Sequence, residues 1–249
     1  MATLENRDLK PHAILDESSR YKKAKKIHLL TEKFGLHRKG TLLEVGTGSG
    51  FIAAYFTKIF SEVNSVDVND QRQTVENIRF KKIEGTKLPF KNEYFDLVIT
   101  NHVIEHVGNY ENQIDHLKEI SRVLKKDGML YLAVPNRWRL IEPHYKLPLL
   151  SWLPHFLSNL YVRLTRKGDF YDCFPLSRSA AFLILKKTGF EVKEATMEAI
   201  RIYAEIESPS PIIKFFISQL PSWVYIPLMP WMSTLIFVCK KKGFLGFDK

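Results

Sequence analysis

The chain has 249 residues, of which 45% are hydrophobic and 26% are charged, and its formal net charge is +10 at pH 7. This length and apolar content suit one globular domain with elaborations and exclude a disordered or low-complexity chain. The two cysteines form no short spacing motif, which argues against a disulfide framework and favours a reducing, cytoplasmic setting. Residues 1–20 are polar and charged without an apolar segment, so we expect no signal peptide.

A basic run at residues 20–26 leads into a helical stripe formed by Ile27, Leu30 and Phe34. We interpret the run as the solvated face of an N-terminal helical cover that occupies residues 1–40. Nucleic-acid binding, in which these cations would neutralise phosphates, is an alternative. No zinc knuckle, RNP-type aromatic motif or recognition helix accompanies the run, however. Attraction to anionic lipid is a third reading of the same charges.

Three alternating glycines follow a short apolar run at residues 41–45, which predicts a buried strand. Residues 51–60 carry apolar side chains at helical spacing, so Gly46, Gly48 and Gly50 lie on a strand-to-helix turn. Such a turn presents free N–H groups to an anionic ligand and predicts a nucleotide-cofactor fold. A dinucleotide fingerprint needs a third glycine where Phe51 stands, which disfavours a nicotinamide cofactor.

A second strand is predicted at residues 63–68, and its acid, Asp67, comes 17 residues after Gly50. In nucleotide folds this position suits a carboxylate that accepts hydrogen bonds from both ribose hydroxyls. The alternative role for Asp67 is that of an N-cap or turn acid. A loop at residues 83–90 follows, in which residues 88–90 form a structural corner, and a further strand is predicted at residues 95–100.

The pattern of residues 122–136 predicts a helix, a turn and another strand. Gly128 is expected to stop the helix in a left-handed conformation, and residues 129–134 to form the strand. Beyond it we expect a helix at residues 179–187, a strand at 190–195 and a last strand at 233–240.

The pattern E-x-G-x-G-x-G at Glu44 to Gly50, with the signals that follow it, resembles the class I S-adenosylmethionine-dependent methyltransferases over residues 41–136. The resemblance implies an α/β fold with a doubly wound, mostly parallel seven-stranded sheet whose last strand is antiparallel. It also implies one methyltransferase domain over residues 1–249, with S-adenosylmethionine as cofactor and the cofactor-binding core at residues 41–136.

The resemblance further implies a set of cofactor-binding residues. Glu84 would accept from the adenine amino group, although the family more often carries Asp there, and the next backbone N–H, at Gly85, would contact the ring. Asn101 and His102 would line the cofactor, while Glu105 and His106 would begin and orient the next helix. The implied set is Glu44, Gly46, Thr47, Gly48, Gly50, Asp67, Val68, Glu84, Gly85, Asn101 and His102.

Residues 102–106 also match H-x-x-E-H, an inverted zinc-protease signature. On a helix the two histidines would share a face, as zinc requires. Because the segment follows the strand predicted at residues 95–100 and no His-rich or Cys-rich cluster accompanies it along the chain, we expect no metal site.

Two long insertions, at residues 137–178 and 197–232, are expected to cover the substrate, because ligands of such sheets bind beyond the carboxyl ends of the strands. Residues 147–162 and 215–239 contain no charged side chain. A transmembrane helix is disfavoured by Pro221, Pro227 and Pro230. The insertions either pack on the core as helical lid pieces or expose an apolar surface for a lipophilic substrate or a bilayer. That surface would contain Trp152, Phe156, Trp223, Tyr225 and Trp231.

We therefore expect methyl transfer to a small or lipid-like acceptor, in the cytoplasm or at the inner face of the membrane, with nucleic acid disfavoured as a partner. The alternatives are an RNA or protein methyltransferase and a non-catalytic interaction module. A general base would assist an oxygen, nitrogen or carbon nucleophile. His144 ranks first because it begins the first insertion; the other candidates are His102, His155, Asp169 and Tyr171.

Overall fold

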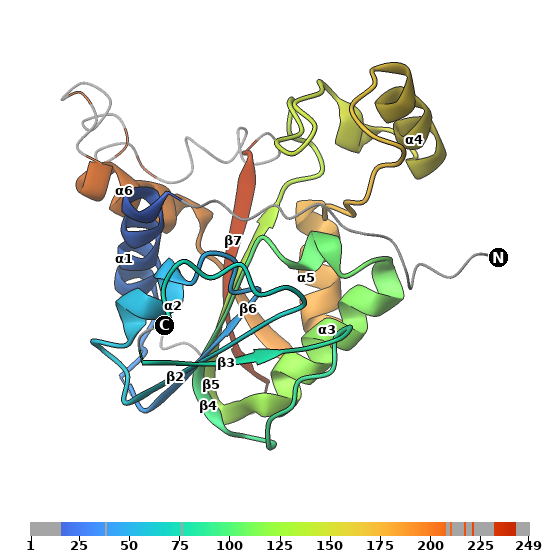
Figure 1. The fold of residues 1–249 in the computed structure, drawn as a ribbon. Helices are drawn as coiled ribbons and strands as arrows, with labels where there is room; N and C mark the ends of the chain where they lie inside the picture. The colour runs from blue at the N-terminus through green and yellow to red at the C-terminus, as the bar shows by residue number, and fades with distance from the viewer. Residues whose placement is uncertain are drawn as a thin grey trace.

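The computed structural model of the protein describes residues 16–37, 39–75, 77–207 and 232–242, together with Ser210, Ile217 and Pro221. Its centre is a seven-stranded sheet in the order β3-β2-β1-β4-β5-β7-β6 (Figure 1). The pairs among β1 to β5 are parallel, and β7 is antiparallel to both of its neighbours. The strands are β1 (Thr41–Val45), β2 (Glu62–Asp67), β3 (Ile78–Lys82), β4 (Phe95–Asn101), β5 (Leu124–Pro135), β6 (Phe190–Glu194) and β7 (Thr234–Lys241). This topology confirms the predicted fold class.

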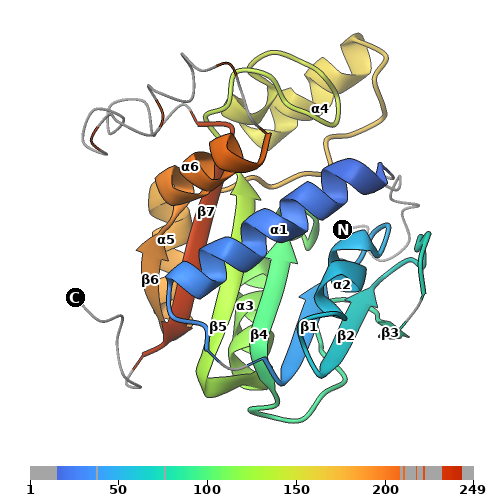
Figure 2. The same ribbon diagram turned by 90° about the vertical axis from the view of Figure 1, so that its left-hand side faces the viewer.

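Helices cover both faces of the sheet (Figures 1 and 2). One face carries α1 (Glu17–Lys33), α2 (Phe51–Phe56) and α6 (Thr196–Glu207), and the other carries α3 (Tyr110–Val123) and α5 (Arg178–Lys187). Each face buries its own apolar cluster, one including Leu42 and Ile27 and the other including Leu43 and Leu117. Alternate residues of β1 thus supply opposite clusters, as expected for a strand buried on both faces.

Two local predictions are wrong. The helix expected at residues 51–60 ends at Phe56, and Gly128 does not stop a helix. Helix α3 ends at Val123, and Gly128 lies inside β5, close to where the pairing with β4 shifts register. A Cβ on Gly128 would lie 2.8 Å from the carbonyl oxygen of Phe95, so the close approach of two strands is what favours glycine here.

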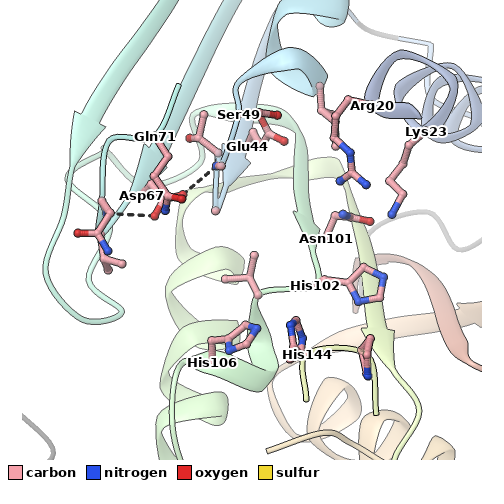
Figure 3. Close-up of a pocket in the computed structure, with 18 of the residues that line it drawn as sticks. Arg20, Lys23, Glu44, Ser49, Asp67, Gln71, Asn101, His102, His106 and His144 are labelled. Atoms are coloured by element: carbon pink, nitrogen blue, oxygen red, sulfur yellow. Dashed lines mark hydrogen bonds between the residues drawn. The ribbon is translucent and has the colours of Figure 1, made fainter. Parts of the chain in front are cut away.

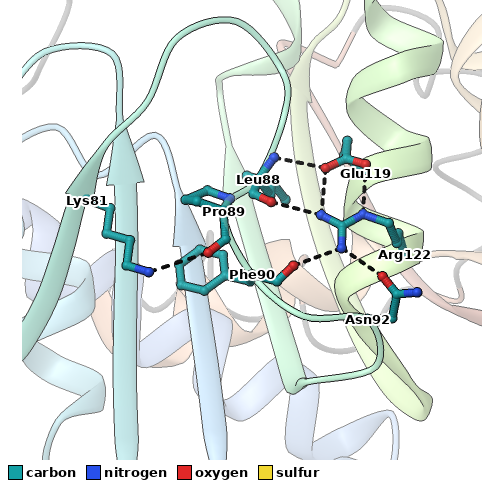
Figure 4. A network of polar contacts seen from close by, with 7 residues as sticks. All are labelled: Lys81, Leu88, Pro89, Phe90, Asn92, Glu119 and Arg122. Carbon is teal, nitrogen blue, oxygen red and sulfur yellow. Dashed lines mark hydrogen bonds and ion pairs between the residues drawn. The ribbon is translucent and has the colours of Figure 1, made fainter.

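The corner at residues 88–90 is held by side chains of α3 (Figure 4). The guanidinium of Arg122 donates to the carbonyl oxygens of Leu88 and Phe90, both at 2.8 Å. Glu119 accepts from the backbone N–H of Leu88 at 2.9 Å and pairs with Arg122. These contacts fasten the corner to α3 and agree with its predicted structural role.

The first insertion lies beyond the carboxyl ends of the parallel strands (Figures 1 and 2). It contains η3 (Leu150–Trp152) and α4 (His155–Leu164), and it has a small apolar cluster of its own that includes Leu150, Val162 and Tyr171. In the second insertion, α6 packs on α1, where Lys22 pairs with Glu207 at 2.8 Å. None of the described helices is long and apolar enough to cross a membrane.

The five aromatic residues expected at the apolar surface have different outcomes. Phe156 is 70% exposed, whereas Trp152 is half-buried and donates from Nε1 to the carbonyl oxygen of Arg139 at 2.9 Å. Trp223, Tyr225 and Trp231 lie outside the described residues.

Candidate functional site

The turn between β1 and α2 is built from glycines in the left-handed region. The φ angles of Gly46, Gly48 and Gly50 are 79°, 52° and 81°, a conformation that side chains with a Cβ rarely adopt. A Cβ on Gly46 would also clash with Cγ2 of Val103. The backbone therefore passes close to its neighbours and keeps its outer surface free of side chains.

The carboxylate of Asp67 braces this turn from the end of β2. Its Oδ2 accepts from the backbone N–H of Gly48 at 2.9 Å, and its Oδ1 accepts from the N–H of Asn69 at 3.1 Å (Figure 3). Each oxygen keeps further accepting capacity, because a carboxylate has about four acceptor positions. Asp67 is thus fixed in orientation and can still bind a pair of hydroxyl groups.

A cavity of about 340 Å³ opens over the turn (Figure 3). The glycine turn and Asp67 form one side, and the end of β4 contributes Asn101 and His102. The first insertion closes the far end with Arg139, His144 and Asp172, and α1 adds cations; these groups come from distant parts of the chain. The cavity therefore runs from the glycine turn to the first insertion.

Most of the expected cofactor-binding residues reach this cavity. Its described lining includes Glu44, Gly46, Thr47, Gly48, Asp67, Val68, Asn101 and His102. Gly50 caps the N-terminus of α2 instead. Glu84 and Gly85 are exposed in the loop after β3 and are not among the lining residues, so their contact with adenine stays a prediction.

Two of the five candidate bases line the cavity, namely His102 and His144. The imidazole of His155 stacks on Phe174 at a centroid distance of 4.3 Å. Tyr171 is buried in the apolar cluster of the insertion, and Asp169 is exposed. His155, Asp169 and Tyr171 are not among the described residues that line the cavity.

Burial shapes the charges of the site. Glu44 is almost completely buried, its Oε2 accepts from the N–H of Ala53 at 3.1 Å, and desolvation raises its pKa to about 8. Desolvation lowers the pKa of Lys23 to about 7, with neighbouring cations adding to the effect. Burial likewise lowers the pKa of His102, so its imidazole is neutral near pH 7. Without a ligand, burial therefore favours the neutral forms of Glu44, Lys23 and His102, and a bound group of opposite charge would favour their charged forms.

The sequence interpretation missed that the basic run of α1 points partly inward. Arg20 and Lys23 both line the cavity, while Lys22 and Lys25 are exposed. The i, i+3 spacing of Arg20 and Lys23 places them on one side of the helix, which is a signal that the sequence does contain. The interpretation of residues 20–26 as a solvated face is therefore wrong for these two side chains.

Residues 102–106 do not form the α-helix that an inverted zinc-protease signature requires. His102 has a φ of 58°, and η2 (Ile104–His106) is a single 3-10 turn. The next helix begins only at Tyr110, with Asn109 as its N-cap, so Glu105 and His106 do not begin it. Both His102 and His106 nevertheless line the cavity.

Comparison with known proteins gives consistent matches. A family model described as a methyltransferase domain matches residues 43–132. Uncharacterized protein MJ1123 of Methanocaldococcus jannaschii is 30% identical over 173 residues, covering 68% of this chain and 72% of that protein. A demethylmenaquinone methyltransferase of Chlorobaculum parvum is 30% identical over 169 residues, covering 63% of this chain and 68% of that protein. The crystal structure of YcgJ from Bacillus subtilis has the same fold, with a TM-score of 0.51, 15% identity and coverage of 88% and 98%.

Proposed function

Because the chain belongs to the class I S-adenosylmethionine-dependent methyltransferases, we propose that it methylates a small lipophilic acceptor presented at a membrane surface. The observation that carries this proposal is the continuity of one cavity from the glycine turn to the insertion. A cofactor held at the turn and an acceptor held under the insertion would meet inside it.

The chain's own residues would hold S-adenosylmethionine as follows. Asp67, already fixed by Gly48 and Asn69, would accept from the ribose hydroxyls. Arg20 and Lys23 would bind the carboxylate of the methionine part, since cations that line a buried cavity bind anions strongly. When bound, the cofactor supplies a methyl group on a sulfonium that is already activated for in-line displacement.

The remaining tasks of the protein are alignment, exclusion of water and proton removal. His102 and His144 line the cavity, and the low pKa of His102 leaves its imidazole free to accept a proton near pH 7. Its Nδ1 lies 3.5 Å from Oε1 of the buried Glu105, which would orient the ring. His102 is therefore the better supported of the two as a base.

The outer surface of the first insertion supports a lipophilic acceptor. Helix α4 buries Ser158 and Val162, while Phe156, Leu160 and Leu164 project from another face at i, i+4 spacing, and Phe156 and Leu164 are more than two-thirds exposed. Further exposed apolar side chains nearby in the chain are Trp138, Leu140, Ile141, Leu149 and Leu157. An exposed apolar helix face of this kind is typical of a membrane or ligand contact.

Cations accompany this apolar face. Arg163, Arg166 and Lys167 are exposed at the end of α4, and Lys146 is exposed in the preceding loop. An apolar face with basic neighbours suits the interface of an anionic bilayer. The names of relatives fit such an acceptor: one is a demethylmenaquinone methyltransferase and another a ubiquinone biosynthesis O-methyltransferase.

The test is transfer of a labelled methyl group from S-adenosylmethionine to a matched pair of phenols or hydroquinones, one with an isoprenoid tail and one without. Both would be offered with anionic vesicles. We expect methylation of the tailed compound and at least about tenfold less of the tailless one, because a buried tail adds about 0.8 kcal/mol of binding per CH₂. Equal methylation of both, or of neither, would contradict the proposal.

A further inference from the structure

We propose that His106, His144 and Cys173 form a binding site for a zinc-class cation at the insertion end of the cavity. Each offers one ligand atom, and these atoms all lie within 4.8 Å of one another. Cys173 Sγ lies 3.7 Å from Nδ1 of His106, and the rings of His106 and His144 have centroids 5.0 Å apart. Figure 3 shows both histidines at the same end of the cavity.

The segments that carry His106 and Cys173 are fastened to each other. The backbone N–H of Phe174 donates to the carbonyl oxygen of Glu105 at 2.8 Å. Nε2 of Gln113, a buried residue of α3, donates to the carbonyl oxygens of Ile104 and Phe174 at 3.2 and 2.8 Å. Hydrogen bonds between neighbouring residues therefore hold His106 and Cys173 side by side, independently of any contact between these two side chains.

The turn that carries His144 is fixed in a similar way. The buried carboxylate of Glu142 accepts from the backbone N–H of Tyr145 at 2.7 Å. The backbone carbonyl oxygen of Glu142 accepts from the N–H of Lys146 at 2.8 Å. The hydroxyl of Tyr145 then donates to Oδ1 of Asp172 at 2.8 Å. This bond joins the turn to the residue next to Cys173, so all three ligands belong to one connected framework.

The chemistry of the three ligands favours zinc over harder cations. One sulfur and two imidazole nitrogens suit Zn²⁺ or a similar transition metal, whereas Mg²⁺ and Ca²⁺ prefer oxygen. Oδ1 of Asp172 lies 3.4 Å from Sγ of Cys173 and adds a carboxylate beside the ligands. Without a cation the thiol of Cys173 donates to this carboxylate, and cation binding would release the thiol proton to solvent. The resulting thiolate and the carboxylate would carry two negative charges, which a divalent cation would balance inside a partly desolvated site.

Ligand atoms of a tetrahedral zinc site lie about 3.3–3.8 Å apart, given metal–ligand distances of about 2.0–2.3 Å. The observed spread of up to 4.8 Å therefore requires only a small side-chain adjustment. Cys173 is buried, while both histidines are partly exposed to the cavity. The cation would be held from the protein side and remain accessible from the cavity.

Three protein ligands with one open position is the arrangement of zinc sites that act on substrates. If the proposed function holds, the open position would bind the heteroatom of the acceptor that receives the methyl group. Cation binding itself does not depend on that function. His144, expected from the sequence to be a base, would then be a metal ligand. The expectation of no metal site would be wrong, because residue spacing along the chain does not reveal that three distant segments meet.

The experiment uses the full chain, stripped with a chelator and titrated with Zn²⁺ and with Co²⁺, without S-adenosylmethionine or acceptor. We expect one ion per chain and a thiolate-to-Co²⁺ charge-transfer band in the near ultraviolet. Cys173→Ser should remove the band and weaken Zn²⁺ binding at least about tenfold. Cys239→Ala, which removes the other buried cysteine, is the matched control and should keep both properties.

Failure of the wild-type protein to bind a stoichiometric ion would overturn the proposal, as would unchanged binding in Cys173→Ser. Should Cys173→Ser not fold, His144→Asn, at a partly exposed position, decides the question: unchanged Zn²⁺ affinity in this variant also overturns the site. Stoichiometric binding together with no methyl transfer to any tailed acceptor would support the site and contradict the proposed function alone.

Discussion

The backbone N–H of Gly48 donates to Oδ2 of Asp67 at 2.9 Å, so the acid at the end of β2 is joined to the glycine turn after β1. We expect Asp67→Ala to weaken binding of S-adenosylmethionine by about 1.5–3 kcal/mol, because a charged hydrogen-bond partner is lost. Calorimetry of the folded variant measures this loss. Asp70→Ala removes a nearby exposed acid that pairs with Arg72 and should leave the affinity unchanged. Equal affinities of Asp67→Ala and wild type would refute the ribose assignment.

The raised pKa of Glu44 predicts a pH-dependent stability of the cofactor-free protein. In the unfolded chain this carboxyl ionises near its ordinary pKa of 4.5, whereas in the folded protein it holds its proton to about pH 8. The free energy of unfolding therefore falls as pH rises between these two values, by up to about 1.4 kcal/mol per pH unit, and changes no further at higher pH. The difference in thermal stability between Glu44→Gln and wild type should therefore grow in favour of the variant from pH 5 to pH 8.

Thermal unfolding at several pH values measures this difference, with Glu17→Gln as the control at an exposed acid of α1. A difference between Glu44→Gln and wild type that stays constant from pH 5 to pH 8 would show that Glu44 ionises normally.

Lys23 and Lys25 lie on the same helix, but Lys23 lines the cavity while Lys25 is exposed. We expect Lys23→Met to reduce affinity for S-adenosylhomocysteine by about 10- to 150-fold, since a charged hydrogen bond contributes about 1.5–3 kcal/mol. Lys25→Met should bind as wild type does. Isothermal titration of both variants checks the assignment, and equal affinities would place the cofactor carboxylate elsewhere.

Gly46 and Val103 are packed so closely that a Cβ on Gly46 would clash with the valine. We expect Gly46→Ala to lose stability and cofactor binding together, from both the clash and the positive φ. Adding Val103→Ala should restore part of the stability by relieving the clash. Gly168→Ala, where a Cβ would meet only ordinary contacts, is the control. No recovery in the double variant would show that the φ angle alone accounts for the loss.

The apolar face of α4 predicts binding to anionic vesicles. Replacing Phe156, Leu160 and Leu164 by serine should abolish flotation with vesicles that contain anionic lipid, because the buried apolar area is lost. Salt should weaken the binding of the wild type. Leu183→Ser changes a comparably exposed leucine of α5, a helix that covers the sheet away from α4, and should float as wild type does. Wild-type protein that fails to float at low salt would contradict membrane contact.

The local signals of this sequence predict the cofactor half well. The strand at residues 41–45, the glycine turn and the acid at Asp67 depend on neighbours in sequence, and the structure places them as expected. The prediction for Gly128 is wrong because this glycine serves an approach between β4 and β5, which is a tertiary contact. Glycine is favoured both where a helix ends and where two strands approach closely, so Gly128 by itself does not distinguish these two structures.

The end of the cavity under the first insertion is far less predictable from the sequence. His144 and His155 are both histidines of one insertion, yet only His144 reaches the cavity, because the path of the loop and α4 decides which ring points inward. The meeting of His106 with Cys173, 67 positions later in the chain, likewise depends on hydrogen bonds between distant segments. No periodicity or spacing encodes such contacts.

The assignment of the cavity as the cofactor site is tested most directly by calorimetric titration of the wild-type protein and Asp67→Ala with S-adenosylhomocysteine, with NADH as the comparison ligand. We predict one molecule of S-adenosylhomocysteine bound per chain, weaker binding in the variant, and no binding of NADH. A folded wild-type protein that binds NADH instead, or that binds S-adenosylhomocysteine no better than the variant does, would contradict this assignment.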